Sequence, residues 1–303
     1  MILFRKFKSM VKLIHYSYLS RHNPQELADR LYIDETGNRN GINWNSPVDL
    51  NEKINWLKFN SDTTKWSELA DKYAVRKFIE EKGYKQYLVP LLGVWENANE
   101  IDFSTLPDSF VLKTNNGAGT VMVVEDKTLI NQRKVRAQLN KWLRMSFGLK
   151  QAEPHYLRIK PLIIAESLLR DVSGISSSLI DYKIWCFDGK AFGTNVLYNR
   201  HCFEADIEWY DREWNYRPEW SAFTNHYRAG GRKITKPKNY EKMISFAEDL
   251  SKGFPQVRVD LYNIDGQIYF GEMTFTTSGG YINAYSKEVL LEMGKLTKLP
   301  TDR

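Results

Sequence analysis

The sequence contains little cysteine and no long apolar run. Cys186 and Cys202 are the only cysteines among 303 residues, and neither belongs to a Cys-x-x-Cys pair. We therefore expect no disulfide framework and a reduced, cytoplasmic protein. The longest apolar run, residues 88–95, is interrupted by Pro90 and Gly93. It is far shorter than the roughly 20 residues that a membrane-spanning helix requires.

Several common motifs are also missing. Nothing before residue 108 resembles Gly-x-Gly-x-x-Gly or a Walker loop, and no internal repeat or low-complexity tract occurs. Residues 1–22 contain basic but no acidic residues, and their charges interrupt the apolar positions, which argues against a signal peptide. Their apolar residues recur at helical spacing and predict a basic amphipathic helix. Such a helix lies either on an anionic membrane or on its own protein.

The overall composition is that of an ordinary globular protein. Hydrophobic residues make up 42% of the chain and charged residues 26%, so a sizeable core is expected. The net charge of +6 favours anionic partners such as nucleotides or acidic glycans, without requiring nucleic acid. Aromatic residues, at 14%, are numerous enough for some to stack on sugar rings.

Hydrophobic periodicity predicts alternating helices and strands along the chain. Residues 23–60 are rich in loop-forming residues and end in a short helix, and residues 200–232 show little periodicity. The patterns predict helices over 50–59, 67–82, 131–147 and 238–252, and strands over 87–95, 110–113, 120–124, 161–169, 181–187, 191–197, 257–262 and 267–274.

Two carboxylates interrupt the last pair of strands. Asp260 and Glu272 lie in β-rich runs that flank Asp265-Gly266, a hairpin signal. A two-residue turn would place the two acids on opposite faces, so we expect a three-residue loop, 264–266, that restores a common face. Arg258 would then lie opposite Glu272, with Asp260 diagonal to it at roughly 7–8 Å. This arrangement suits one or two Mg²⁺ ions, and the alternative is a structural ion pair with Arg258.

A second informative stretch is a lysine followed by a glycine loop. Lys113 ends a predicted strand, and Gly117 and Gly119 follow before the next strand begins. Glycines allow backbone N–H groups to approach phosphates closely, and the lysine supplies a point charge. The pattern suits a lid over a triphosphate, and a flexible hairpin is the alternative. The buried strand that ends near Glu166 offers a carboxylate and backbone groups to an adenine edge, or simply caps a core strand.

These motifs, in this order, resemble the ATP-grasp superfamily. More closely, they resemble its teichuronopeptide-biosynthesis type over residues 45–300. The resemblance is carried by Asn-Glu-Lys-Ile-Asn-Trp-Leu at 51–57, Val-Leu-Lys-Thr-Asn at 111–115, Val-Arg-Val-Asp-Leu-Tyr at 257–262, Gly-Glu-Met-Thr-Phe at 271–275, and the stretches 69–76, 90–95 and 181–183.

The resemblance implies an α+β chain with an ATP-grasp fold, in which two α/β subdomains clamp ATP below a mainly helical N-terminal region. It implies boundaries at 1–108, 109–170 for the lid and 171–303 for the core. For ATP, it assigns phosphate contacts to Lys113 and Lys72, the loop above the phosphates to Asn115, Gly117 and Gly119, and adenine contacts to Glu166, Ser167, Leu168 and Leu169. It assigns ribose or phosphate contacts to Asp181 and Lys183. It assigns Mg²⁺ binding to Asp260, Glu272 and Thr274, and stabilisation of the reacting phosphate or the intermediate to Arg258.

The sequence departs from the family pattern at two places. Thr274 stands where many ATP-grasp ligases have asparagine, and the loop reads Asn-Asn-Gly-Ala-Gly instead of Asn-His-Gly-Ser-Gly. The resemblance implies a ligase that uses ATP and Mg²⁺ to join an amino acid or amine to a uronic acid carboxylate of a surface polysaccharide or its precursor. We expect it in the cytoplasm, where residues 1–22 could bring it to the inner face of the membrane or to a lipid-linked glycan. The alternatives are a sugar kinase, a glycan-binding protein and a metal-dependent glycosyltransferase.

Overall fold

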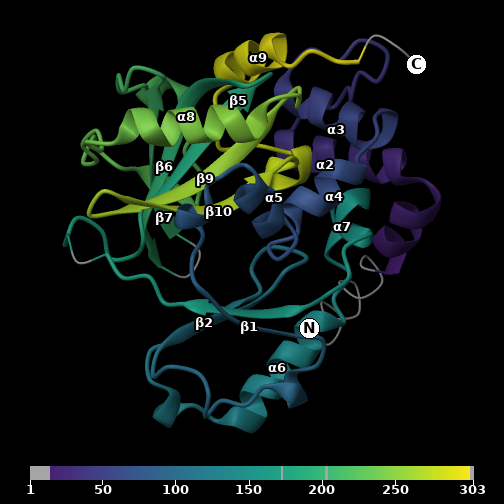
Figure 1. The fold of residues 1–303 in the computed structure, drawn as a ribbon. Helices are drawn as coiled ribbons and strands as arrows, with labels where there is room; N and C mark the ends of the chain where they lie inside the picture. Colours follow the sequence, from purple (N-terminus) through teal and green to yellow (C-terminus); the bar gives the residue numbers. More distant parts are fainter. Residues whose placement is uncertain (1–13, 172, 202–203, 301–303) are drawn as a thin grey trace.

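The computed structural model describes residues 14–171, 173–201 and 204–300, which form a larger body and a smaller layer below it (Figure 1). Residues 14–22 are helical, and the α-helices that follow are α2 (Pro24–Thr36), α3 (Leu50–Asn60), α4 (Thr64–Ala70), α5 (Val75–Glu81), α6 (Gln132–Leu143), α7 (Pro154–Leu157), α8 (Tyr240–Ser251) and α9 (Lys287–Leu296). The strands are β1 (Leu91–Trp95), β2 (Phe110–Thr114), β3 (Val121–Val124), β4 (Ile163–Ser167), β5 (Asp181–Phe187), β6 (Lys190–His201), β7 (Glu204–Asp211), β8 (Tyr227–Ala229), β9 (Val257–Ile264) and β10 (Gln267–Thr274).

The body is built on a six-stranded sheet in the order β10-β9-β5-β6-β7-β8. Along each strand, successive side chains point to opposite faces of the sheet. Val257, Val259 and Leu261 of β9 are buried on the face that α8 covers. Arg258 and Asp260 therefore lie on the other face, where α3, α9 and the segment after β10 pack. This second face carries the buried polar side chains discussed below.

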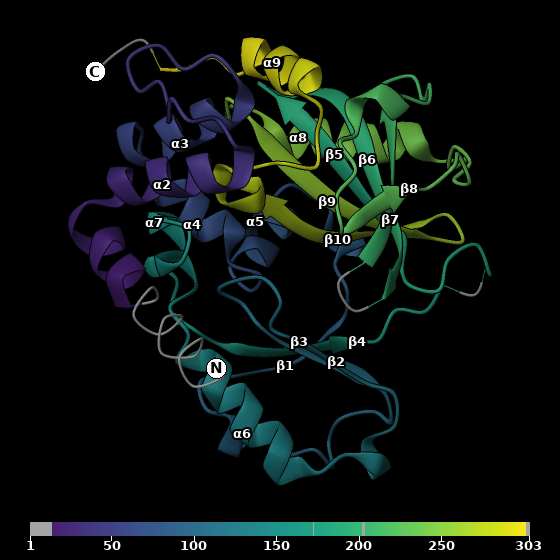
Figure 2. The same cartoon turned by 180° about the vertical axis from the view of Figure 1, so that it is seen from behind.

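The smaller layer is a four-stranded sheet in the order β1-β4-β2-β3, with α6 packed against it (Figure 2). Its core includes Phe110 and Leu112 of β2 and Leu139 of α6. β1 pairs with β4 although it precedes residue 108, so the layer includes a strand from the N-terminal region. After α6 the chain returns to the body, where α7 packs against α4, and then enters the layer again as β4.

Three local predictions were wrong. The predicted helix over 67–82 is two helices, because the Asp71 carboxylate accepts the backbone N–H groups of Tyr73 and Ala74 and interrupts the helix. Residues 200–232, expected to be irregular, contain β7 and β8. Residues 23–60, expected to be mainly loop, contain α2, whose Asn23 side chain caps the first turn.

The hairpin of β9 and β10 corrects the predicted register. The loop has two residues, Asp265 and Gly266, with φ values of 50° and 84°, as the twist of a tight hairpin requires. A shift of register between Phe270 and Glu272 places Glu272 directly opposite Asp260. Gly271 occupies this bulge, where a Cβ atom would lie 2.9 Å from the Asp260 carbonyl oxygen. The two acids share a face, as predicted, but because of a bulge rather than a longer loop.

Candidate functional site

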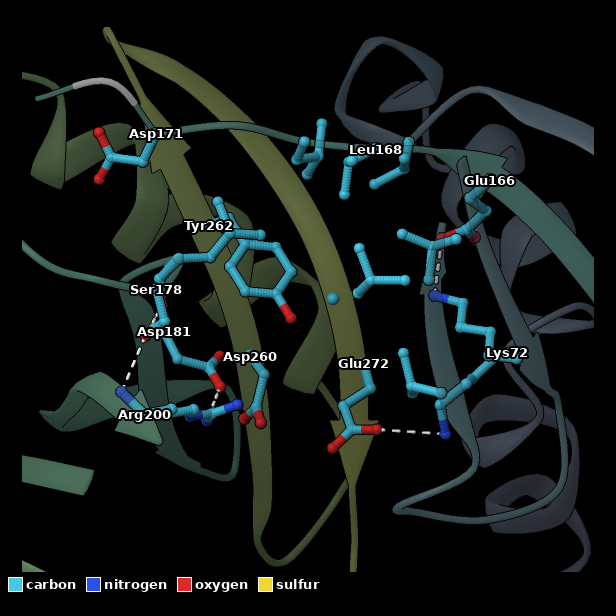
Figure 3. A pocket seen from close by; sticks show the side chains of 18 of the residues that line it. Lys72, Glu166, Leu168, Asp171, Ser178, Asp181, Arg200, Asp260, Tyr262 and Glu272 are labelled. Atoms are coloured by element: carbon cyan, nitrogen blue, oxygen red, sulfur yellow. Dashed lines mark hydrogen bonds and ion pairs between the residues drawn. The ribbon is translucent and has the colours of Figure 1, made fainter. Parts of the chain in front are cut away.

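A cavity of about 850 Å³ lies between the body and the smaller layer (Figure 3). Twelve of the fifteen residues singled out from the sequence line it: Lys72, Lys113, Gly117, Gly119, Glu166, Ser167, Leu168, Leu169, Asp181, Lys183, Asp260 and Glu272. Asn115, Arg258 and Thr274 do not line it. The topology thus gathers residues that are up to 200 positions apart in the sequence.

The paired acids differ in their surroundings. Asp260 is buried, and its carboxylate accepts hydrogen bonds from Arg258 Nε at 2.7 Å, Arg258 Nη2 at 2.8 Å and Lys183 Nζ at 2.5 Å. Burial by itself would raise the pKa of Asp260, but the two cations outweigh it and lower the pKa to about 2. Glu272 retains 31% of its side-chain surface and faces the cavity. It is the more accessible carboxylate of the pair.

Lys72 connects the glycine loop, residues 115–120, to this hairpin. Its ammonium donates to the Gly117 carbonyl at 2.6 Å and lies 3.4 Å from the Glu272 carboxylate. Its backbone N–H donates to the carbonyl of Asn115. Burial opposes ionisation of Glu272, but the nearby Lys72 charge contributes to holding its pKa below the ordinary value. One lysine from the break between α4 and α5 therefore touches both sides of the cavity.

Lys113 and Glu166 form an ion pair at the end of the cavity formed by the smaller layer. Lys113 Nζ lies 2.6 Å from Glu166 Oε2, and Arg76 Nη1 lies 3.3 Å from the other oxygen, Oε1. The pair arises because β2 and β4 are neighbours in the sheet. Arg76 was not singled out from the sequence, although it ends one of the stretches that carry the family resemblance. The carboxylate is thus neutralised on both sides.

Glycine is required at the two loop positions, 117 and 119, for different physical reasons. A Cβ atom on Gly117 would lie 2.6 Å from the Phe147 ring, so this position requires glycine for close packing. Gly119 has φ of 74° and open space around its Cα, which leaves its backbone accessible to the cavity. Asn115 lies at the base of the loop, where its side chain donates to Asp71 and accepts from the Leu162 N–H at 2.7 Å.

Arg200 is a cavity residue that the sequence did not reveal. Its guanidinium forms an ion pair with Asp181, and its backbone N–H donates to Ser178 Oγ at 3.0 Å. Lys183 Nζ lies 3.0 Å from the same Asp181 carboxylate. Asp181 and Lys183 were predicted to share a face, and they do. No sequence signal marked Arg200, because it lies near the end of the long strand β6, beside a stretch without periodicity.

Arg258 contacts both acids but does not line the cavity. It pairs with Asp260, and its Nη1 donates to Thr277 Oγ1 at 3.1 Å. Its Nη2 also donates to Thr274 Oγ1 at 3.2 Å, and the Thr274 hydroxyl donates to Glu272 Oε1 at 3.3 Å. Thr274 therefore links Arg258 to Glu272.

The sequence profile of the family described as TupA-like ATP-grasp matches residues 52–298, most of the chain. This chain belongs to the TupA-like ATP-grasp family. Its two layers together form an ATP-grasp fold. No functionally curated protein matches the sequence.

Several solved structures have similar folds to this TupA-like protein. D-alanine–D-alanine ligase from Bacillus anthracis complexed with ATP shares 14% identity, with a TM-score of 0.42 and coverage of 82% of this chain and 65% of that one. D-alanine–D-alanine ligase from Helicobacter pylori shares 14% identity, with a TM-score of 0.41 and coverage of 83% and 69%. The ATP-grasp ligase PsnB, complexed with minimal precursor, Mg and ADP, shares 12%, with a TM-score of 0.41 and coverage of 82% and 66%. This chain thus spans about two thirds of the length of these proteins.

The acidic residues of this TupA-like protein fit a divalent ion only in part. Within the described ranges, no group of three or more acidic, histidine or cysteine side chains could hold a metal ion by itself. Glu272 and Asp260 nevertheless lie opposite each other and face the same space. Mg²⁺ commonly takes one or two carboxylates and completes its shell with phosphate oxygens and water. The donor set therefore suits Mg²⁺ that arrives with a polyphosphate.

The predicted membrane contact falls mainly outside the described part of the chain. Residues 1–13 of the expected N-terminal helix are not described, and residues 14–22 are helical. Among the helices that the structure describes, none is long and apolar enough to cross a membrane.

Proposed function

We propose that this protein is an ATP-dependent ligase that joins an amine to a carboxylate. One observation carries the proposal: the hairpin acids of the body face the lysine-anchored glycine loop across a single cavity. The cavity volume of about 850 Å³ is within the usual range for small-molecule sites, roughly 300–1,000 Å³. Family membership supports the same reading.

The cavity residues divide by chemistry. Lys113, Lys72 and the open backbone at Gly119 supply positive charge and N–H groups suited to phosphates. The apolar stretch of Leu168 and Leu169, which follows β4, suits an adenine ring. We assign adenine-edge contacts to Glu166 and Ser167, and ribose or phosphate contacts to Asp181 and Lys183.

Glu272 and Asp260 are the carboxylates that would hold Mg²⁺, with Thr274 beside them. The bound ion would offset the charge that develops on the phosphate oxygens. Arg258 and Lys183 bond closely to Asp260, whereas Glu272 lies 3.4 Å from Lys72 and 3.7 Å from Arg258, so Glu272 is the carboxylate that would meet the ion first.

In the proposed reaction, a carboxylate oxygen of the acceptor attacks the γ-phosphorus of ATP, and ADP leaves. The amine then attacks the carbonyl carbon of the acyl phosphate, loses a proton, and phosphate leaves. We assign to the Arg258 guanidinium the stabilisation of negative charge on the acceptor side, because it bonds to Asp260, which lines the cavity. Removal of one such donor costs on the order of 3–4 kcal/mol of barrier.

We propose a uronic acid carboxylate of a surface polysaccharide or its precursor as the acceptor, and an amino acid or small amine as the donor. The net charge of +6 and the aromatic and basic residues between 198 and 232 support an acidic glycan. The cytoplasmic face of the membrane is the expected place of action, because ATP is available there.

A panel of uronates crossed with amino acids tests the proposal, with ADP release measured and products weighed. ADP release that requires both partners, with a product mass equal to the two joined minus water, is expected. Turnover with a sugar alone and a phosphorylated product would identify a kinase. Sugar transfer from a nucleotide sugar would identify a glycosyltransferase, and glycan binding without turnover would leave only a binding protein.

A further inference from the structure

A second, smaller cavity lies on the body side of the acids. It measures about 50 Å³, and Lys183 lines both cavities. Arg258, Thr277 and Ser278 form part of its wall. A water molecule occupies roughly 30 Å³ in the liquid, so this space suits one small polar group such as a carboxylate.

The segment that contributes Thr277, Ser278 and Ile282 to the wall of the second cavity has an unusual backbone. Ser278, Gly279 and Gly280 have φ values of 50°, 69° and 88°, three successive residues in the left-handed region. This conformation is unfavourable for a serine, and glycine loses much chain entropy when it is fixed. The conformation therefore needs support from outside the segment.

The helix α3 supplies this support. Asn55 Nδ2 donates to the Gly280 carbonyl at 2.8 Å, and Lys58 Nζ donates to the Gly279 carbonyl at 2.8 Å. One turn earlier, Asn51 donates to the Ile282 carbonyl at 2.9 Å and accepts from the Ile282 N–H at 2.8 Å. The three side chains are four and three residues apart, so they lie on one face of the helix.

The side-chain nitrogens of all three residues donate to the segment, and Asn55 Nδ2 also donates to the Asn51 carbonyl at 2.9 Å. All are at most 2% exposed, and a buried polar or charged group is costly unless it is hydrogen-bonded. Lys58 makes its remaining polar contacts with the Gln151 carbonyl at 3.2 Å and the Tyr281 hydroxyl at 3.3 Å. These hydrogen bonds thus fix the position of the 279–282 backbone relative to α3.

We propose that Asn51, Asn55 and Lys58 are positioning residues, and that the 277–282 segment they hold forms the wall against which the reacting carboxylate of the acceptor lies. The inference rests on the proposed ligase function. Thr277 would transmit the position of the segment to Arg258, because its Oγ1 accepts from Arg258 Nη1. The carboxylate would enter the second cavity beside Lys183, next to the phosphate site.

Two substitutions test the proposal, one on α3 and one on the segment that α3 holds. Asn55→Ala removes the bond from the helix, and Gly280→Ala changes only the segment, where a Cβ atom would lie 2.8 Å from Asn55 Nδ2. Since a misplacement of about 1 Å can cost on the order of 100-fold in rate, we expect kcat/KM for the acceptor to fall roughly 10- to 100-fold in each variant. The dissociation constant of ATP, measured by calorimetry, should stay at the wild-type value.

Lys53→Ala is the matched control. Lys53 lies on the same helix and donates to a backbone carbonyl, that of Thr297 at 2.8 Å, but lines neither cavity. We expect wild-type kinetics for both substrates. If Asn55→Ala does not fold, Gly280→Ala gives the same kinetic readout without any change in α3.

The outcomes separate the two proposals. A wild-type enzyme that joins amine and carboxylate, with unchanged acceptor kinetics in both folded variants, would overturn this inference and leave the ligase function standing. An equal loss of ATP affinity and acceptor efficiency would also overturn it, because that pattern indicates general damage. A wild-type protein that never couples ADP release to a carboxylate would remove the ligase function and this inference with it.

Discussion

Substitution of the two hairpin acids should separate their structural roles from their chemical ones. We predict that Asp260→Asn and Glu272→Gln both abolish ADP release, because both carboxylates face the phosphate site. Their effects on stability should differ. Asp260→Asn leaves Arg258 and Lys183 buried without their shared counter-ion, and breaking a buried pair in this way costs about 3–5 kcal/mol.

The pKa of Asp260 gives an independent magnitude. A pKa held at about 2 instead of near 3.8 corresponds to stability on the order of 2 kcal/mol at neutral pH. Because the folded pKa is depressed, this contribution is present above pH 3.8 and is lost as the pH falls through about 2. Glu272 is more exposed and lies 3.4 Å from Lys72, so Glu272→Gln should cost about 1 kcal/mol or less.

Thermal unfolding without nucleotide, at pH 7, measures the difference. For a chain of 303 residues, 3–5 kcal/mol corresponds to a fall in Tm of about 5–8 °C for Asp260→Asn, and we expect about 2 °C at most for Glu272→Gln. A wild-type Tm for Asp260→Asn would refute the reasoning about the buried cations. Equal losses in the two variants would refute the contrast between the acids, and full ADP release by either would refute its place at the phosphate site.

Three further predictions concern other parts of the chain. Lys113→Met should weaken ATP binding on the order of 100-fold in calorimetry while the protein stays folded, because Glu166 keeps a second cationic partner; unchanged affinity would contradict the phosphate role. Gly117→Ala should raise KM for ATP, since its Cβ would meet the Phe147 ring at 2.6 Å, and Gly117→Ala/Phe147→Ala should recover part of the loss; no recovery would mean that the contact is not the cause. Burial lowers the pKa of His155 to about 3, and neither ring nitrogen has a hydrogen-bond partner among the described residues, so the unfolded chain takes up a proton first as the pH falls below 6.5. As the pH falls from 6.5 to 4, the free energy of unfolding, measured in urea, should therefore decrease less for His155→Phe than for the wild type. The difference in slope should be up to about 1.4 kcal/mol per pH unit. Parallel curves for wild type and variant would exclude this role of His155.

The chemistry of the hairpin could be predicted from the sequence, but its register could not. Period-two alternation identified Asp260 and Glu272 as acids inside strands, and the demand for a common face was right. A bulge at Gly271 places the two acids on the same face. A glycine inside a strand is a recognised but weak signal for a bulge. The predicted three-residue loop was wrong, because the strands are joined by the two-residue turn Asp265-Gly266.

Contacts between segments far apart in the chain could not be predicted from sequence patterns. Lys113 and Glu166 were both singled out, yet nothing local indicated that β2 and β4 would be neighbours and pair the two charges. The same holds for Asn55, which belongs to a stretch that carries the family resemblance but has its partner 225 residues away. Local periodicity predicts which face a side chain occupies, whereas the partner depends on the packing of the whole chain.

The attachments of the glycine loop have a consequence for how a nucleotide would be received. Lys72, Asp71 and Phe147, which fix Gly117 and Asn115, all belong to segments that pack on the body rather than on the small sheet. The loop also joins β2 to β3, and Asn115 bonds to Leu162 just before β4, so the loop is held from both layers. A triphosphate therefore meets a preorganised cradle, and little binding energy is spent on ordering it.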